Sequence, residues 1–135
     1  MSDILLDSDI VIEVLRQRDS DIVASWTNLA ESEESLFYSP VTLAEVRHGM
    51  RFREKQAVDE IFSAMICIAI GEEIGRRAGD YLRAFHGSHA VALGDALIAA
   101  TATAHHLRLW TRNRKHFPMS NVRFFVHPKR TSPSD

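Results

Sequence analysis

The sequence lacks the features of a membrane or secreted protein. None of its apolar runs approaches the roughly 20 residues that a membrane-spanning helix needs, and its N-terminus, MSDILLDSDIVIEVL, carries acids where a signal peptide needs positive charge. Its single cysteine, Cys67, has no disulfide partner and lies in the apolar run MICIAI, where we expect a buried thiol. These absences predict a cytoplasmic protein with no membrane contact and no thiol chemistry.

Acidic residues are scarce at the C-terminal end. Residues 1–100 hold 17 acids and 9 Lys or Arg, whereas residues 101–135 hold 1 acid and 7 Lys or Arg. A basic end can simply be solvated, but an acidic cluster beside a basic rim also suits a metal site that faces a polyanion. With 135 residues, 45% of them hydrophobic, the chain has room for one domain with a buried core. We expect this domain over residues 1–127 and a disordered tail, PKRTSPSD, over 128–135.

Apolar spacing predicts strands that alternate with one or two helices. Such an order favours an α/β fold, with a mostly parallel central sheet flanked by helices on both faces. The predicted strands are ILL, SLFYS, a buried ICIAI, LRLWT and VRFFVH. The predicted helices are SDIVIEVLRQ, DSDIVASWTNLAESEE, a segment from Pro40 onward, KQAVDEIFSAM, GEEIGRRAGDYLRAF (ended by the loop GSHAVALG) and a helix that starts near Asp95.

Three acids are expected to meet at one edge of this sheet. Open parallel sheets bind ligands at the carboxyl ends of their strands. Asp7 ends the first strand, Glu45 lies on the helix after the second strand, and Asp95 starts a helix that can begin at the same edge. Each acid has a simpler interpretation: Asp7 or Asp95 as a helix N-cap, and Glu45 as an exposed helix acid. Asp9 is either a cap or an outer acceptor.

Converging carboxylates repel one another and need a counter-ion. Oxygen ligands without a His/Cys cluster suit Mg²⁺ or Mn²⁺. Such an ion can activate water for attack on a phosphodiester, while Arg112, Arg114 and Lys115 hold backbone phosphates. The aromatic residues Trp26, Trp110 and Phe117 are better explained as core than as base-stacking platforms, and adjacent His105 and His106 diverge too far on a helix to share one ion.

The motifs that carry these acids resemble the PIN-domain ribonucleases and, within them, the VapC toxins of bacterial toxin–antitoxin pairs. LLDSDIVIEVL is similar to the family's opening strand, with Asp7 as the first metal-binding acid and Asp9 at its Asn/Asp/Ser position. SPVTLAEVRHG is similar to the second motif and places Glu45. GDALIAATATAHHLRLWTRNRKHF is similar to the third and fourth motifs, with Asp95 and the strand-end signature TRN. The resemblance covers about residues 3–127.

The resemblance implies a metal-dependent endoribonuclease that cleaves cellular RNA and is neutralised by a cognate antitoxin, and it implies a homodimer. Thr111 would hydrogen-bond among the acids, as the family's Ser/Thr does. One departure is plain, because many members carry a fourth acid in or just after TRN, whereas no Asp or Glu occurs between Asp95 and Asp135. Asn113 can still orient a water through its amide, and His116 is best explained as a surface residue.

Two other functions remain open at this stage. A PIN-like domain without the fourth acid can be a non-catalytic module that binds a protein partner. The DSDIV segment also fits the DxDxV opening of haloacid-dehalogenase-type phosphatases, in which the first Asp is a nucleophile. That class needs a later lysine and a further acid pair, but the chain has only Lys55, Lys115 and Lys129, and no second acid follows Asp95 within its helix.

Overall fold

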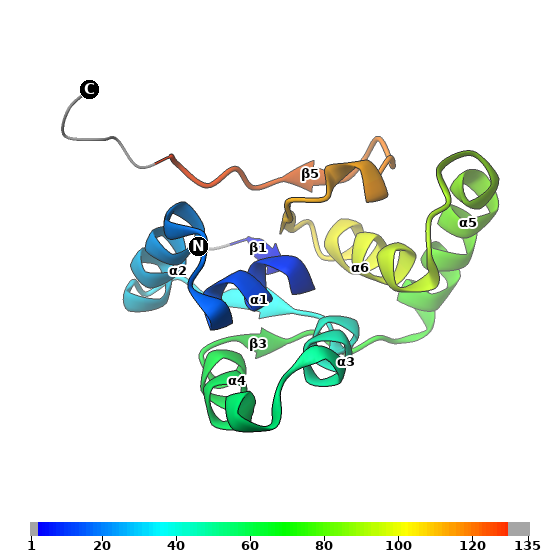
Figure 1. Ribbon diagram of the computed structural model, residues 1–135. Coiled ribbons are helices and arrows are strands. Elements are labelled where there is room, and N and C mark those ends of the chain that lie inside the picture. The colour runs from blue at the N-terminus through cyan, green and yellow to red at the C-terminus, as the bar shows by residue number, and fades with distance from the viewer. Residues whose placement is uncertain (1–2, 130–135) are drawn as a thin grey trace.

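The computed structural model describes residues 3–129 (Figure 1). Short strands alternate with longer helices along this part of the chain. The elements are β1 (Ile4–Leu6), α1 (Ser8–Arg16), α2 (Ser20–Glu31), β2 (Leu36–Tyr38), α3 (Pro40–Gly49), η1 (Phe52–Glu54), α4 (Lys55–Ser63), β3 (Ile66–Cys67), α5 (Glu72–His89), α6 (Leu93–Ala104), β4 (Arg108–Trp110), η2 (Arg114–His116) and β5 (Arg123–Phe124).

The strands form one sheet in the order β3-β2-β1-β4-β5, and every neighbouring pair is parallel. β1 lies in the middle, with Ile4 opposite Leu36 of β2 on one side and Arg108 of β4 on the other. Parallel neighbours require long crossover connections. Helices supply them between β1, β2 and β3, and the loop that contains η2 supplies the one between β4 and β5. The predicted α/β class with a parallel central sheet is confirmed.

Alternate residues of the central strands belong to two separate hydrophobic cores, one on each face of the sheet. Leu5 and Leu109 pack with residues of α5 and α6, whereas Leu6 and Trp110 pack with residues of α1, α2 and α4. The same division is visible in Figure 1, where α5 and α6 lie on one side of the strands and α1, α2 and α4 on the other. This alternation fixes the register of each strand, and the predicted core positions of Trp26, Trp110 and Phe117 are confirmed.

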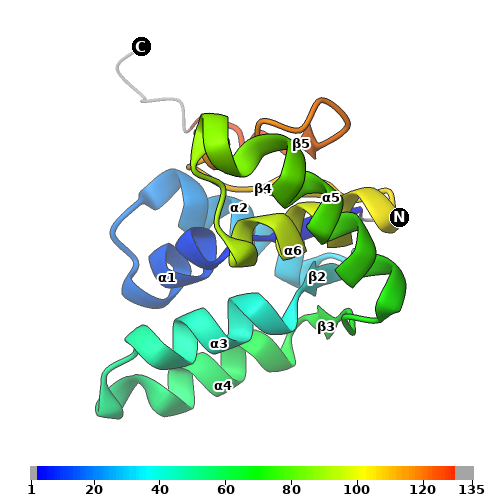
Figure 2. The same cartoon turned by 90° about the vertical axis from the view of Figure 1, so that its right-hand side faces the viewer.

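Two helices start directly at the carboxyl ends of their strands. α1 follows β1 after a single residue, Asp7, and α3 follows β2 after Ser39, whose hydroxyl accepts a hydrogen bond from Val41 N at 3.1 Å. Pro40 occupies the first turn of α3, where its missing N–H costs nothing. α3 then runs alongside α4 (Figure 2). Both helix starts therefore lie at one edge of the sheet.

The predicted burial of the strand ICIAI and of the Cys67 thiol is wrong. The segment ICIAI is not a buried strand, because β3 is an edge strand with one neighbour and its side chains face solvent. Ile66 is 50% exposed, and Cys67 is an exposed free thiol. Only Ile68 and Ile70, beyond the strand, pack against the core beneath α5 and α6. Two helix boundaries also differ, since α5 continues to His89 through part of the predicted loop, and α6 begins at Leu93, ahead of Asp95.

The C-terminal tail is described only in part. Residues 128 and 129 follow as irregular chain, and the remainder of the predicted disordered tail, residues 130–135, lies outside the described residues. The domain end at residue 127 therefore stays a prediction. Between residues 3 and 129, no helix combines the length and the apolar character that crossing a bilayer requires.

Candidate active site

Asp7 and Thr111 meet at the carboxyl edge of the sheet. Each directly follows a central strand, and Asp7 N donates to Trp110 O at 3.0 Å, which extends the pairing of β1 and β4 by one residue. The Asp7 carboxylate is almost fully buried, with 7% exposure. It accepts hydrogen bonds from Ser8 N and from the Thr111 hydroxyl, both at 2.8 Å. Asp7 is therefore the N-cap of α1 and also a buried acid at the sheet edge, so the two interpretations are compatible.

Asp9 lies in the first turn of α1 and faces the loop that follows β4. Its Oδ2 accepts hydrogen bonds from Arg112 N at 2.9 Å and from Asn113 Nδ2 at 3.3 Å. Its Oδ1 is buried and, among the described residues, has no hydrogen-bond partner. A buried carboxylate oxygen without a donor is costly, and it is the kind of atom that a cation or its water shell can satisfy.

Glu45 and Asp95 approach this edge from α3 and α6. Asp95 is the third residue of α6, and its Oδ2 accepts from Ala92 N at 3.3 Å, which stabilises the first helical turn. Gly94 lies against α3, since a Cβ added there would be 3.4 Å from Val41 Cγ1 and 3.9 Å from Glu45 Oε2. These are ordinary contact distances, and they show that the start of α6 lies beside α3, which brings Asp95 near Glu45.

Burial and mutual repulsion disfavour negative charge on these acids. Burial, together with the neighbouring charges of Asp9 and Glu45, raises the pKa of Asp7 to about 7, although the Thr111 and Ser8 hydrogen bonds oppose the rise. The pKa of Glu45 is raised first by burial and then by Asp95 and Asp9, and burial raises the pKa of Asp9. Asp7, Asp9, Glu45 and Asp95 therefore share one electrostatic environment that would gain from a cation.

The acids do not form a finished ligand set. Among residues 3–129, no three His, Cys, Asp or Glu side chains are already placed to enclose one metal ion. The oxygen-only donors nevertheless fit Mg²⁺, which keeps several of its waters and needs only a few protein ligands. The free Oδ1 of Asp9 and the raised pKa values fit the same ion. Side-chain rotation on cation binding would be needed to complete the site.

The predicted phosphate-binding residues lie beside the acids, but they are not equivalent. Arg112 is engaged within the protein, because its guanidinium bonds Glu13 at 2.8 Å and lies 3.7 Å from Asp19. The Arg114 guanidinium lies over the Phe124 ring, with 5.0 Å between Cζ and the ring centroid. Lys115 is exposed on η2. Lys115 and Arg114 are thus better placed than Arg112 to meet a polyanion.

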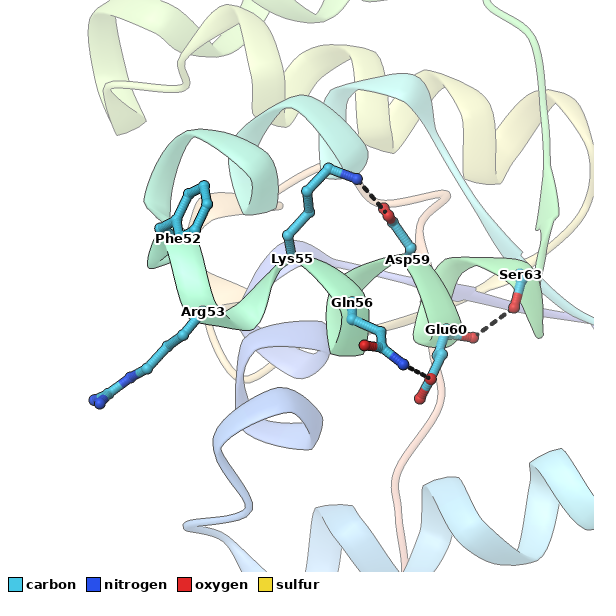
Figure 3. A pocket seen from close by; sticks show the side chains of 7 residues that line it. All are labelled: Phe52, Arg53, Lys55, Gln56, Asp59, Glu60 and Ser63. Carbon is cyan, nitrogen blue, oxygen red and sulfur yellow. Dashed lines mark hydrogen bonds and ion pairs between the residues drawn. The ribbon is translucent and has the colours of Figure 1, made fainter.

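The site is an open edge of the sheet and does not coincide with a distinct surface hollow that lies along η1 and α4. That hollow is bordered by Phe52, Lys55 and Asp59 (Figure 3), and it contains none of the predicted site residues. Two of its charged groups, Lys55 and Asp59, pair with each other at 2.9 Å. Surface shape therefore does not locate the acids, whereas strand order and burial do.

Sequence reasoning missed three residues that shape the site. Glu13 is a buried acid on α1 that bonds Arg112. Gly94 lies where the start of α6 contacts Val41 and Glu45 of α3. Ser8 places its hydroxyl within hydrogen-bonding reach of Glu45 and lowers the pKa of that acid against the effect of burial. Glu13 left one visible signal, a single acid within the apolar run IVIEVL, whereas the contacts of Gly94 and Ser8 depend on tertiary packing.

The parallel sheet, with a cluster of acids at the carboxyl ends of its strands, is typical of a class of nuclease domain. The PIN domain profile matches residues 4–122 of the chain, and the chain therefore belongs to the PIN-domain family. The match confirms the resemblance seen in the three motifs and removes the phosphatase alternative. It also places Asp7, Glu45 and Asp95 all within the matched region.

Two relatives of the chain are named VapC ribonucleases. The chain is 41% identical to "Ribonuclease VapC10" of Mycobacterium tuberculosis over 119 residues, which cover 86% of each chain. It is 33% identical to "Ribonuclease VapC19" of the same species, over 85% of this chain and 92% of the relative. Among solved structures, FitAcB from Neisseria gonorrhoeae superposes with a TM-score of 0.72 and 27% identity, over 91% of this chain and 96% of that one.

Proposed function

We propose that this protein is a metal-dependent endoribonuclease toxin of the VapC type, which cleaves cellular RNA and is held inactive by a cognate antitoxin. The observation that carries the proposal is the set of acids Asp7, Glu45 and Asp95, brought from three separate segments to one edge of a PIN-domain sheet. The names of the relatives, two of them ribonucleases, support the same reaction class.

Asp7, Glu45 and Asp95 would hold Mg²⁺ or Mn²⁺. When bound, such an ion neutralises the acids, activates water and stabilises charge on a phosphodiester oxygen. Asp9 supports the site through its free Oδ1, and Thr111 orients Asp7 by its 2.8 Å hydrogen bond. The Asn113 amide, which donates to Asp9, is close enough to the acids to orient a water for in-line attack on phosphorus.

Basic residues beside the acids would hold the RNA backbone. Arg114 and Lys115 lie on η2, directly after the loop that contacts Asp7 and Asp9. A positive surface next to an acidic metal site attracts a polyanion and orients its phosphates. Arg112 contributes less to phosphate binding than Arg114 and Lys115, because Glu13 already occupies its guanidinium.

The antitoxin would cover exposed apolar surface. A groove between α1, α2 and α4 is lined by the apolar residues Val23, Trp26 and Ile61 and by the polar residues Gln17, Thr27 and Glu60, and a groove of this mixed character suits an amphipathic helical partner. The names of several superposable structures, including a toxin–antitoxin complex from Klebsiella pneumoniae, support a protein partner of this kind. We further propose that the chain forms a homodimer, as expected for the family.

Cleavage of total cellular RNA by antitoxin-free protein tests this function. The reaction is run with Mg²⁺ or Mn²⁺, with EDTA, and with the Asp7→Asn variant. Discrete fragments that need the metal and are absent with Asp7→Asn would support the nuclease, and sequencing of their ends would identify the target. Intact RNA in the presence of a folded, metal-binding protein would instead favour the non-catalytic partner-binding module.

A further inference from the structure

Glu13 is a buried acid whose charge is compensated from two directions. It lies on α1, one turn beyond Asp9, and its side chain is only 4% exposed. Its Oε1 accepts hydrogen bonds from Arg18 Nη2 at 2.7 Å and from Arg112 Nη2 at 2.8 Å. Arg18 is a local partner, whereas Arg112 comes from the loop after β4, 99 positions away. A buried carboxylate is retained only when it is well paired, so Glu13 holds this loop strongly.

Arg112 is attached to α1 at both its backbone and its side chain. Its N–H donates to Asp9 Oδ2 at 2.9 Å, while its guanidinium bonds Glu13 and lies 3.7 Å from Asp19 Oδ2. Because Asp9 and Glu13 are four residues apart, they lie on one face of α1. The loop therefore runs along that face and is fixed to it at two levels.

The neighbours of Arg112 in the loop are the groups that contact the acids. Thr111 donates to Asp7, and the Thr111 Oγ1 accepts from Asn113 N at 3.0 Å. Asn113 Nδ2 donates to the same Asp9 oxygen that Arg112 N contacts. Displacement of Arg112 would thus move both Thr111 and Asn113 relative to Asp7 and Asp9.

We propose that Glu13 and Arg112 are positioning residues: the ion pair between the buried Glu13 carboxylate and Arg112 fixes the loop of residues 111–113 on α1 and so sets the geometry of the metal site. The proposal rests on the proposed function for the identity of the metal and the substrate. Neither residue touches the reacting atoms. This role differs from phosphate binding by Arg112, because loss of a positioning residue weakens metal binding and leaves KM unchanged, whereas loss of a phosphate ligand raises KM and leaves metal binding unchanged.

Metal affinity tests the pair without RNA. Mn²⁺ binding to the full-length chain is measured by isothermal titration calorimetry for Glu13→Gln, Arg112→Met and the double variant. Each single variant should bind Mn²⁺ about tenfold more weakly, the usual effect of removing a group that orients a metal ligand. The double variant should lose little more, because the two residues act as one unit.

Glu54→Gln is the matched control. Glu54 is also a mostly buried glutamate paired with an arginine of α1, since its side chain is 13% exposed and lies 3.5 Å from Arg16. It lies on η1 and has no contact with the loop of residues 111–113 among the described hydrogen bonds. This control should bind Mn²⁺ with wild-type affinity, which separates the loss of a buried ion pair in general from the loss of this one.

Steady-state RNA cleavage then distinguishes the two roles of Arg112. Under our proposal, Arg112→Met lowers kcat about tenfold and leaves KM unchanged. If Arg112 instead binds phosphate, Arg112→Met raises KM and leaves Mn²⁺ affinity unchanged, while Glu13→Gln frees the arginine and lowers KM. That second pattern, or wild-type Mn²⁺ affinity in both single variants, would overturn the proposal.

The test remains decisive if Glu13→Gln does not fold or if the wild-type chain does not cut RNA. If Glu13→Gln fails to fold, as judged by thermal unfolding, Arg112→Met carries the test, because the Arg112 side chain is 43% exposed and its truncation is easier to tolerate. If the wild-type chain binds Mn²⁺ but cuts no RNA, the proposed nuclease function fails, while the Mn²⁺ measurements still decide whether the ion pair sets the metal site.

Discussion

Thr111 and Asp7 are 104 positions apart in the sequence, yet the Thr111 hydroxyl donates to Asp7 Oδ2 at 2.8 Å. The bond joins the ends of the two central strands, and the same Thr111 oxygen accepts from Asn113 N at 3.0 Å. One hydroxyl thus links the most buried acid of the site to the loop that carries Asn113.

Thr111→Val preserves the shape of the side chain and removes its hydrogen bonds. Loss of a buried hydrogen bond should lower the free energy of unfolding by about 1–2 kcal/mol, which urea denaturation can measure. Because the Thr111 bond lowers the pKa of Asp7, that pKa should rise further. The acid limb of the pH–rate profile should therefore move to higher pH, whereas an unchanged acid limb would contradict the role assigned to Thr111.

Asp7→Asn should stabilise the metal-free protein at alkaline pH. The pKa of Asp7 rises from 3.8 to about 7 in the folded chain. Between these values the folded chain keeps a proton that the unfolded chain releases, so the free energy of unfolding falls as pH rises through this window. Without a charge, the Asn oxygen can accept from Ser8 N, and its Nδ2 can donate to Thr111 Oγ1, which reverses the direction of that hydrogen bond. We expect the free energy of unfolding of Asp7→Asn to exceed that of wild type by about 2–4 kcal/mol at pH 8, because the rise in the Asp7 pKa on folding sets the upper limit. At pH 4 we expect almost no difference.

Thermal unfolding in EDTA across this pH range measures the effect. Asp80→Asn is the control, because Asp80 is an exposed acid on α5, and it should shift Tm little at any pH. A gain for Asp7→Asn that is equal at pH 4 and pH 8 would show that burial of the charge is not its cause.

Mn²⁺ should stabilise the wild-type chain and do so more strongly as pH rises. The acids must lose their protons to bind the ion, so metal affinity should increase from pH 5.5 to pH 8. At a concentration 100 times the Kd, binding adds about 2.7 kcal/mol to the free energy of unfolding. Differential scanning fluorimetry with and without Mn²⁺ gives the measurement. A Tm shift of the same size in Asp95→Asn would place the ion elsewhere.

The order of elements and the acids were predictable from the sequence because they depend on local patterns. The alternating apolar residues of ILL and LRLW fix which side chains face each core, and the parallel order follows from the helices between strands. The exposure of Ile66 and Cys67 was not predictable, since nothing in the local sequence shows that ICIAI forms an edge strand.

The sequence predicted which acids lie together at the candidate site, but it did not predict the ion pairs that surround them. Position relative to the strands brought Asp7, Glu45 and Asp95 to one edge. Pairing of Arg112 with Glu13 depends on which face of α1 meets the loop after β4, and that is a property of the packed chain. The sequence therefore predicts phosphate binding by Arg112, because this arginine is close to the acids. In the folded chain its guanidinium pairs with Glu13.

Asn113→Asp introduces an acid into the loop after β4, where many family members carry a fourth acid. The variant tests how the lack of that acid affects metal binding. Asn113 Nδ2 donates to Asp9 Oδ2 at 3.3 Å, and a carboxylate there replaces this donor with a like charge. The metal-free variant should have a lower Tm than wild type, and Mn²⁺ should recover the loss. Calorimetry should also show additional Mn²⁺ bound per chain if the missing acid limits the number of ions. Equal Tm values without metal would contradict the contact between residues 9 and 113.

If a cation held by the acids of the sheet edge drives RNA cleavage, the cleavage rate should depend on Mn²⁺ and on each of these acids. One RNA fragment cut by the wild-type chain is used to compare the wild-type chain with Asp95→Asn and Asp80→Asn. We predict that Asp95→Asn loses more than about 100-fold in rate at every Mn²⁺ concentration, while Asp80→Asn matches wild type. Wild-type cleavage by a folded Asp95→Asn variant, or cleavage that persists in EDTA, would contradict the account.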